Sequence, residues 1–352
     1  MPVLFTNEDR TLAIQRLTAL WAFNECGLGG FLHAINSPFT GLVVGSIAML
    51  CIAGISYFSD QKFKTVMTSL LIVLIIKGLV SPHSTPTAYL AVTFQAITGA
   101  VFYRYIPGLL FSSILFVTIG QLESAFQRLL TLTILYGNPL WKAVDMWGEY
   151  VTKRWSIILP VSASQFIIMV YVIIHFITGI VVGWMIYKLL KSIPSQWGDI
   201  RYRLELGEQH KKDFLRVDRS KNKWKRWIVF CVLLVMIVLA YVLFGEKSNY
   251  FGILTIIRSI LFLVLWFVFI GPLIMKWIQQ YLLKKQQSLS VQIASTMDVF
   301  PHLLWILDTT WKETKSLKGI RRWKTFVTQS LLTILQFRTS YDPSSDRPNK
   351  EL

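Results

Sequence analysis

The sequence predicts an all-α integral membrane protein with about eight transmembrane helices, arranged as a six-helix bundle, a two-helix hairpin and a cytoplasmic amphipathic tail. Hydrophobic residues make up 53% of the 352-residue chain and charged residues only 16%, whereas soluble domains carry about 25% charged residues. Apolar runs of about 20 residues recur, which is the length that crosses the hydrocarbon core of a bilayer. These runs are too long and too uniform for the short alternating strands of an outer-membrane barrel.

Turn residues separate the apolar runs and set the expected bounds of each span. Breaks fall at "NSP", "SPHSTP", "IPG" and "YGNP", because clusters of Pro, Gly, Asn and Ser mark turns and end helices. The expected spans cover residues 11–34, 38–58, 64–81, 87–106, 108–136, 162–190, 226–245 and 250–282.

The distribution of charge predicts the orientation. Residues 188–226 carry twelve Lys and Arg against five Asp and Glu, and such basic loops stay in the cytoplasm. Counting spans outward from this loop places both termini in the cytoplasm, in a multi-pass protein of the cytoplasmic (inner) membrane. The net charge of +17 is then explained by topology, and nucleic acid is not an expected partner.

The connection over residues 138–161 falls outside the membrane in this map. It carries aromatic residues at positions where a helix lying in the membrane surface would hold them at the headgroup level. These residues are Trp141, Trp147, Tyr150 and Trp155.

The chain divides at the basic loop. Residues 1–193 are expected to form a six-span membrane bundle with an outward-facing binding site, and residues 194–225 the basic cytoplasmic loop. Residues 226–283 form an apolar two-span hairpin. Residues 284–352 are too polar to span, and they are expected to form cytoplasmic amphipathic helices followed by a disordered tail.

Polar residues inside the spans form the candidate binding site, since charged groups in the hydrocarbon core normally face the bundle interior or water. Glu25 lies eight residues before His33, roughly 12 Å below the outer surface. Several spans thus carry hydrogen-bonding groups beneath two uncharged loops, a pattern that indicates a pocket open to the outside. The expected substrate-binding residues are Trp21, Asn24, Glu25, His33, His83, Tyr89, Gln95, Gln121 and Glu123.

These residues also have a structural interpretation, which the sequence leaves open. Glu25 or Glu123 can pair with Lys77 or Arg128 and lock helices together, and Gln95 can act as interhelical glue.

Small residues on the first span form a face that lets another helix approach closely. That helix belongs either to the bundle itself or to a partner subunit. The expected docking residues are Ala19, Ala22, Gly27 and Gly30.

Enzymatic chemistry has no support in the sequence. There is no phosphate-binding G-x-x-x-x-G-K-[ST] loop, no H-E-x-x-H and no G-x-S-x-G, which are the motifs of common nucleotide, metalloprotease and hydrolase sites. His33 and His83 with a nearby carboxylate would suit a divalent metal, but their spacing is not diagnostic. We expect no enzyme activity, no metal site and no cofactor.

Residues 25–50, "ECGLGGFLHAINSPFTGLVVGSIAML", and residues 77–108, "KGLVSPHSTPTAYLAVTFQAITGAVFYRYIPG", resemble the substrate-binding S component of energy-coupling-factor (ECF) vitamin transporters. The resemblance covers roughly residues 10–193, with six spans, a proline-led second span and small residues around Gln95. It implies a six-helix bundle that binds a vitamin or related micronutrient from its outer face.

The resemblance also implies partners. That family docks through small residues of its first helix onto a transmembrane scaffold subunit, which ABC-type ATPases drive. The matching positions are Ala19 and Ala22, although the spacing is A-x-x-A rather than the family's A-x-x-x-A. The last two spans and the basic tail are similar to part of the scaffold subunit, without its A-R-G signature.

The leading interpretation is a substrate-binding component of a micronutrient (vitamin-like or metal) uptake transporter, powered by partner ATPases. Its expected partners are the lipid bilayer, a small-molecule ligand, a scaffold subunit and the ATPases. The alternative is a membrane assembly or scaffold protein that works through its basic cytoplasmic surface. An ion-coupled carrier using Glu25 and Glu123 is less favoured, because carriers usually show two related halves and this chain shows none.

Overall fold

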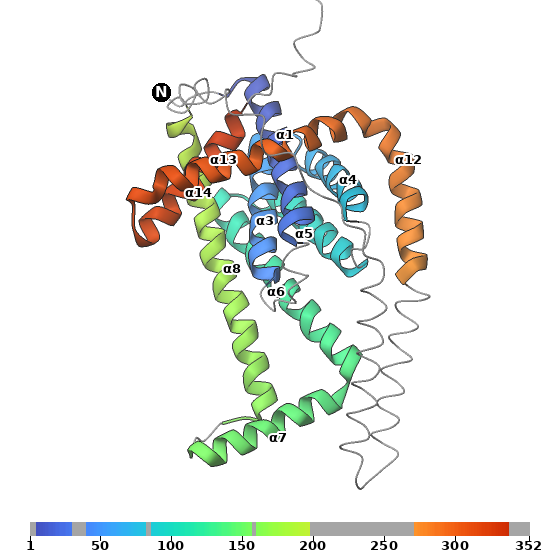
Figure 1. The fold of residues 1–352 in the computed structure, drawn as a ribbon, viewed down its shortest axis with the longest axis vertical. Coiled ribbons are helices and arrows are strands. Elements are labelled where there is room, and N and C mark those ends of the chain that lie inside the picture. The colour runs from blue at the N-terminus through green and yellow to red at the C-terminus, as the bar shows by residue number, and fades with distance from the viewer. Residues whose placement is uncertain (1–4, 30–39, 82–85, 157–159, 198–270, 338–352) are drawn as a thin grey trace, which may run out of the picture.

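The computed structural model describes residues 5–29, 40–81, 86–156, 160–197 and 271–337. Every regular element within these ranges is helical (Figure 1). The ten α-helices are α1 Asn7–Phe23, α3 Thr40–Phe58, α4 Lys62–Val80, α5 Pro86–Tyr105, α6 Leu109–Tyr136, α7 Asn138–Trp155, α8 Ala163–Gln196, α12 Gly271–Asp298, α13 Phe300–Glu313 and α14 Gly319–Gln336. A π-helix, η1, covers Asn24–Leu28, and a 3-10 helix, η4, covers Thr314–Ser316. The all-helical prediction is therefore confirmed for the described residues.

Four of the described helices are long and apolar enough to cross a membrane, namely α3, α4, α6 and α8. Their bounds follow the predicted runs closely, although α8 continues to Gln196 instead of ending at residue 190. α1 falls outside this set because it has only 17 residues and carries four charged side chains. α5 is long enough but too polar. Multi-pass helical membrane character is thus supported, while the predicted spans at 226–245 and most of 250–282 lie outside the described residues.

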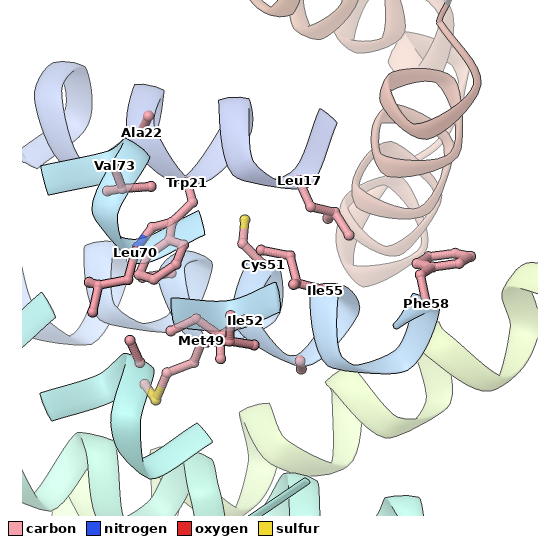
Figure 2. Packing of buried hydrophobic residues seen from close by; sticks show 14 of the residues in the cluster. Leu17, Trp21, Ala22, Met49, Cys51, Ile52, Ile55, Phe58, Leu70 and Val73 are labelled. Carbon is pink, nitrogen blue, oxygen red and sulfur yellow. The ribbon is translucent and has the colours of Figure 1, made fainter. Parts of the chain in front are cut away.

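The main core lies between α1, α3 and α4. Figure 2 shows Leu17 and Trp21 of α1 facing Met49 and Ile52 of α3, with Leu70 of α4 closing the layer. All are buried. Because lipid is as apolar as these side chains, close packing rather than exclusion of water holds such helices together.

Helices α6 and α8 pack through a pair of glycines spaced four residues apart. A Cβ at Gly179 would lie 2.5 Å from Thr118 Cα, and one at Gly183 would lie 2.7 Å from Ile114 Cα. The two backbones therefore touch, which only glycine permits. This G-x-x-x-G spacing, "GIVVG", is present in the sequence as the signal for such a contact.

Helix α7 begins and ends close to the predicted surface helix at 138–161. Trp147, Tyr150 and Trp155 are exposed, and Trp141 Nε1 donates to Thr133 Oγ1 of α6 at 3.2 Å. Figure 1 shows α7 crossing the far end of α6 and α8. An exposed aromatic face at the end of the apolar helices is the arrangement expected of an interfacial helix.

The opposite end of the bundle gathers the start of α1 and the ends of α3 and α8. The Phe5 ring lies 5.2 Å from that of Phe58 and 4.9 Å from that of Trp197. Lys62 Nζ donates to the Tyr103 carbonyl oxygen at 2.9 Å, which brings the start of α4 to the end of α5. We call this the basic end, and it is the end at which the predicted topology places the cytoplasm.

Helices α13 and α14 lie across the basic end (Figure 1). Arg16 Nε donates to the Phe337 carbonyl oxygen at 2.8 Å, and Gln336 Nε2 donates to that of Trp197 at 2.7 Å. The tail is helical as predicted, and it packs on the first bundle. α12 runs without a break through residue 283, where the hairpin was predicted to end.

Candidate ligand-binding site

The adjacent polar residues Asn24 and Glu25 lie in the π-helical turn. The backbone N–H of Gly29 donates to the Asn24 carbonyl oxygen five residues earlier. A π-turn holds one more residue than an α-turn and is frequent at functional sites. This wider turn carries both side chains inward, and both are buried. The predicted span at 11–34 did not anticipate the change of helix type.

Glu25 has a partner inside the chain. Lys77 Nζ of α4 lies 2.6 Å from Glu25 Oε2, with side chains only 5% and 6% exposed. Of the two interpretations that the sequence left open for Glu25, this geometry is that of a pair locking η1 to α4. Tyr89 of α5 lies beside it, with its ring centroid 5.9 Å from Lys77 Nζ.

Two amide side chains bind the first turns of α3. Asn24 Nδ2 donates to the Val44 carbonyl oxygen at 2.9 Å. Gln121 Nε2 of α6 donates to Ser46 Oγ at 2.9 Å and, more weakly, to the Leu42 carbonyl oxygen at 3.4 Å. Both amides thus use their donor end on α3, which leaves their oxygens for other partners.

Glycines of α3 admit two further polar side chains to its backbone. A Cβ at Gly45 would lie 3.4 Å from Gln95 Nε2 of α5, and one at Gly41 would lie 3.0 Å from Ser124 Cβ of α6. Gln95 is a predicted site residue, whereas these glycines are not among the predicted set. Their spacing of four residues on a predicted span was the available signal.

We call Gln95, Gln121 and Ser124, with Ser46 facing them, the amide cluster. Gln95 is 4% exposed and Gln121 is 0% exposed, and neither Oε1 atom has a hydrogen-bond partner among the described residues. A buried acceptor without a partner costs about 1–3 kcal/mol, so native structures contain few of them. Two such oxygens, on side chains that both approach the first turns of α3, are suited to accept hydrogen bonds from a solute that carries N–H or O–H groups.

Other predicted site residues also carry a buried polar atom with no partner in the described part of the chain. Trp21 lies in the core between α1, α3 and α4, as Figure 2 shows, whereas Tyr89 OH points toward Gly78 of α4. These atoms are Trp21 Nε1, Asn24 Oδ1, Tyr89 OH and Glu123 Oε2. The predicted set therefore splits into the amide cluster, the surroundings of the Glu25–Lys77 pair, and Trp21 in the core, with Glu123 half-buried on α6.

His33, His83 and Gly30 lie outside the described residues, so the predicted outer loops add nothing to this geometry. Within the described ranges, no three His, Cys, Asp or Glu side chains gather as they would around a metal ion.

The predicted docking alanines are covered by the chain itself. Ala19 is buried in a cluster with Val299, Leu303 and Ile306 of the tail, and Ala22 is buried in the main core. Packing within the chain, one of the two alternatives for this face, is therefore what the structure shows for both alanines. Among the described residues, Gly27 has only the Phe23 ring near it, at 3.7 Å from an added Cβ.

Comparison of the chain with protein-family models, with curated proteins and with solved structures found no match.

Proposed function

We propose that the chain is the membrane-embedded substrate-binding component of a micronutrient uptake transporter, and that the amide cluster contacts the solute. The observation that carries this proposal is the pair of buried, unpartnered oxygens of Gln95 and Gln121. They lie on α5 and α6 against the glycine-lined start of α3. Membrane bundles place ligand sites between facing helices, and this layer combines rigid backbone with free acceptors.

The chemistry of the cluster favours a neutral, donor-rich solute. Its free groups are amide oxygens, whereas the nearby carboxylate of Glu25 is occupied by Lys77. A neutral acceptor pair rejects an analogue that lacks the matching N–H or O–H group, because the oxygens are then left unpaired. Binding of this kind requires no catalysis and no cofactor.

The resemblance to ECF S components supplies the expected partners, a scaffold subunit and ABC-type ATPases. In that family the small residues of the first helix dock on the scaffold. Here α13 and α14 of the same chain cover Ala19. We propose that the tail takes over this part of the scaffold's contact, and that the ATPases remain separate.

The eight-span map in the inner membrane, with both termini cytoplasmic, is part of the same proposal. Two features of the described helices support it. Exposed Lys188 and Lys191 lie near the end of α8, at the basic end, as the positive-inside rule requires. The aromatic face of α7 lies at the other end, where the outer headgroups would be.

A paired substitution tests the amide cluster. We expect Gln95→Met with Gln121→Met to fold with a melting temperature close to that of the wild type, because the removal of two unpaired acceptors offsets the loss of the Gln121 Nε2 bond to Ser46. Native mass spectrometry of the purified full chain should show a co-purifying small molecule in the wild type and none in the variant. The matched control is Gln127→Met, which replaces another glutamine of α6, the helix that carries Gln121. Gln127 Nε2 donates to the Thr87 carbonyl oxygen at 3.0 Å, and the Gln127→Met variant should retain the small molecule.

Two outcomes would count against the proposal. One is clear destabilisation of the Gln95→Met, Gln121→Met variant, which would mean that both glutamines serve as interhelical glue. The other is the same co-purifying mass in wild type and variant, which would place the ligand elsewhere.

An assembly or scaffold role is the second candidate, and one feature favours it. Basic and aromatic side chains are exposed on α14, among them Arg321, Trp323 and Lys324. A scaffold role predicts that partner proteins co-purify with the full chain and that no small molecule does. The partner proteins should still co-purify when the amide cluster is substituted.

A further inference from the structure

A single apolar stripe runs along the whole of α14, but only half of it is covered. Its members are spaced three or four residues apart and therefore share one face of the helix. Leu331 and Ile334 are 3% and 1% exposed, whereas Ile320, Trp323 and Val327 are 88%, 58% and 37% exposed.

The covered half of the stripe packs on the transmembrane bundle. Leu331 belongs to the main core, and Ile334 packs in the cluster that contains Ala19 of α1. The uncovered half continues in the same direction, and Figure 1 shows the α13–α14 pair extending past α8. Because α8 is a candidate membrane span, the surface that continues the bundle beside it is the bilayer.

Two side chains near the basic end of α8 indicate where the bilayer surface meets this helix. Lys188 Nζ lies 3.7 Å from the centroid of the Trp184 ring. A Trp with a neighbouring Lys is typical of the headgroup level, where the ring sits in the interface and the ammonium reaches water.

The charge around the uncovered stripe indicates which lipids it would meet. Residues 314–337 contain five Lys or Arg and no Asp or Glu. Basic residues in the first turns of a helix face the positive end of its dipole, so helix stability does not explain them. Anionic headgroups attract such residues, at about 1 kcal/mol for each one near the surface. The exposed members of this set are Lys315, Lys318, Arg321 and Lys324.

The protruding end is held in shape by its own contacts. The Arg322 guanidinium lies 3.9 Å from the centroid of the Trp311 ring of α13, and the Trp311 and Phe326 rings lie 5.1 Å apart. The exposed stripe is therefore presented by a packed helix pair, which lowers the entropy cost of docking.

We propose that the uncovered half of α14 docks on the anionic headgroup surface of the bilayer beside α8. Ile320, Trp323 and Val327 enter the interface, and Lys318, Arg321 and Lys324 contact the lipid phosphates. The helix pair thereby couples the end of α1, through Ala19, to the lipid surface. This inference stands independently of the amide cluster.

Hydrogen–deuterium exchange of the unmodified full chain in lipid nanodiscs tests the docking. Residues 320–327 should be more protected in phosphatidylcholine that contains about one quarter phosphatidylglycerol than in phosphatidylcholine alone. Residues 331–335 are buried in both and provide the internal control. Lys318→Gln, Arg321→Gln and Lys324→Gln should each lower the ratio of docked to undocked helix roughly fivefold.

A probe at position 323 separates lipid from other occupants. The probe is an environment-sensitive fluorophore on Trp323→Cys, in a chain without its three native cysteines. Its fluorescence should be quenched by lipids that carry a quencher near the headgroup. Thr325→Cys, on the opposite side of the same helix, should not. A probe at 323 that stays in water overturns the proposal. So does a probe that is shielded but not quenched by lipid, since a protein partner or a second copy would then cover the stripe. Protection that is equal in the two lipids also overturns it.

Discussion

The residue with the sharpest energetic consequence is Glu25. We expect Glu25→Gln to lower the free energy of unfolding by about 3–5 kcal/mol, because it leaves the Lys77 ammonium buried without its counter-charge. Adding Lys77→Met should restore most of the loss. Thermal unfolding of the single and double variants measures both effects, and Glu123→Gln, on a half-buried carboxylate, serves as the control. If Glu25→Gln unfolds at the same temperature as the wild type, the Glu25–Lys77 pair does not stabilise the fold. The interpretation of Glu25 as a ligand-binding group would then be favoured.

At the residue scale, the sequence offered the Glu25–Lys77 pair as one of two alternatives, but it did not predict the partners of the buried amides. Asn24, Gln95 and Gln121 were predicted as site residues because polar groups inside apolar runs must face the bundle interior, and all three are buried. Which partner each one meets depends on the relative rotation of helices, which no single-chain pattern contains. The π-turn at Asn24 was equally hidden, since it involves no proline.

At the scale of helices, the close packing of α6 and α8 predicts that a larger residue at either contact glycine lowers stability. We expect Gly183→Ala to cost about 1–3 kcal/mol, because its Cβ would meet the Ile114 backbone and the helices must separate. Gly179→Ala should act in the same way. Gly27→Ala is the matched control, since its Cβ would have only the Phe23 ring near it in the described part of the chain. Equal melting temperatures for Gly183→Ala and Gly27→Ala would show that α6 and α8 are not in backbone contact.

The stability of the junction between α7 and α8 should depend on pH. The backbone N–H of Ser164 donates to Asp145 Oδ1 at 2.8 Å, and this bond, followed by one from the Ser164 hydroxyl, holds the pKa of Asp145 below its ordinary value. Because the pKa of Asp145 is lowered, its carboxylate stabilises the junction at pH values above its pKa in the unfolded chain, which is about 3.9. That contribution is lost as the pH falls through the lowered pKa.

Amide exchange checks this sign. The protection factor of the Ser164 amide should be higher at about pH 6 than at about pH 3. Asp145→Asn keeps an acceptor without the charge, so its protection should change little between the two conditions. A wild-type protection factor that does not change with pH would contradict the role given to Asp145.

At the scale of elements, length and turn residues predicted the helices well. α5 and α6 begin and end near the predicted positions because Gly and Pro at their ends leave little choice. The same reasoning did not anticipate that α12 passes through residue 283. No breaking residue stands there, and only the rise in polarity suggested an end.

In the whole molecule the tail packs on the bundle of residues 1–193, because Leu331, Leu332 and Leu335 belong to the main core. Long-range packing of this kind follows from matching surfaces, which the separate amphipathic patterns of two segments do not reveal. The amide cluster lies entirely within residues 1–193, the segment expected to form the binding unit, and its role in binding stays a prediction.

Sidedness is the property of the whole molecule on which every proposal depends. We expect a membrane-impermeant maleimide added to intact cells to label Glu149→Cys on α7 and to miss Asp60→Cys at the basic end. The same reasoning from sequence predicts labelling at Ser84→Cys and none at Ser220→Cys, two positions outside the described residues. The physical reason is the charge excess in residues 188–226, because basic segments are retained in the cytoplasm. Permeabilised cells give the control, in which all four positions should react. The reverse pattern in intact cells would invert the map, place the amide cluster nearer the cytoplasm, and rule out capture of a solute from outside.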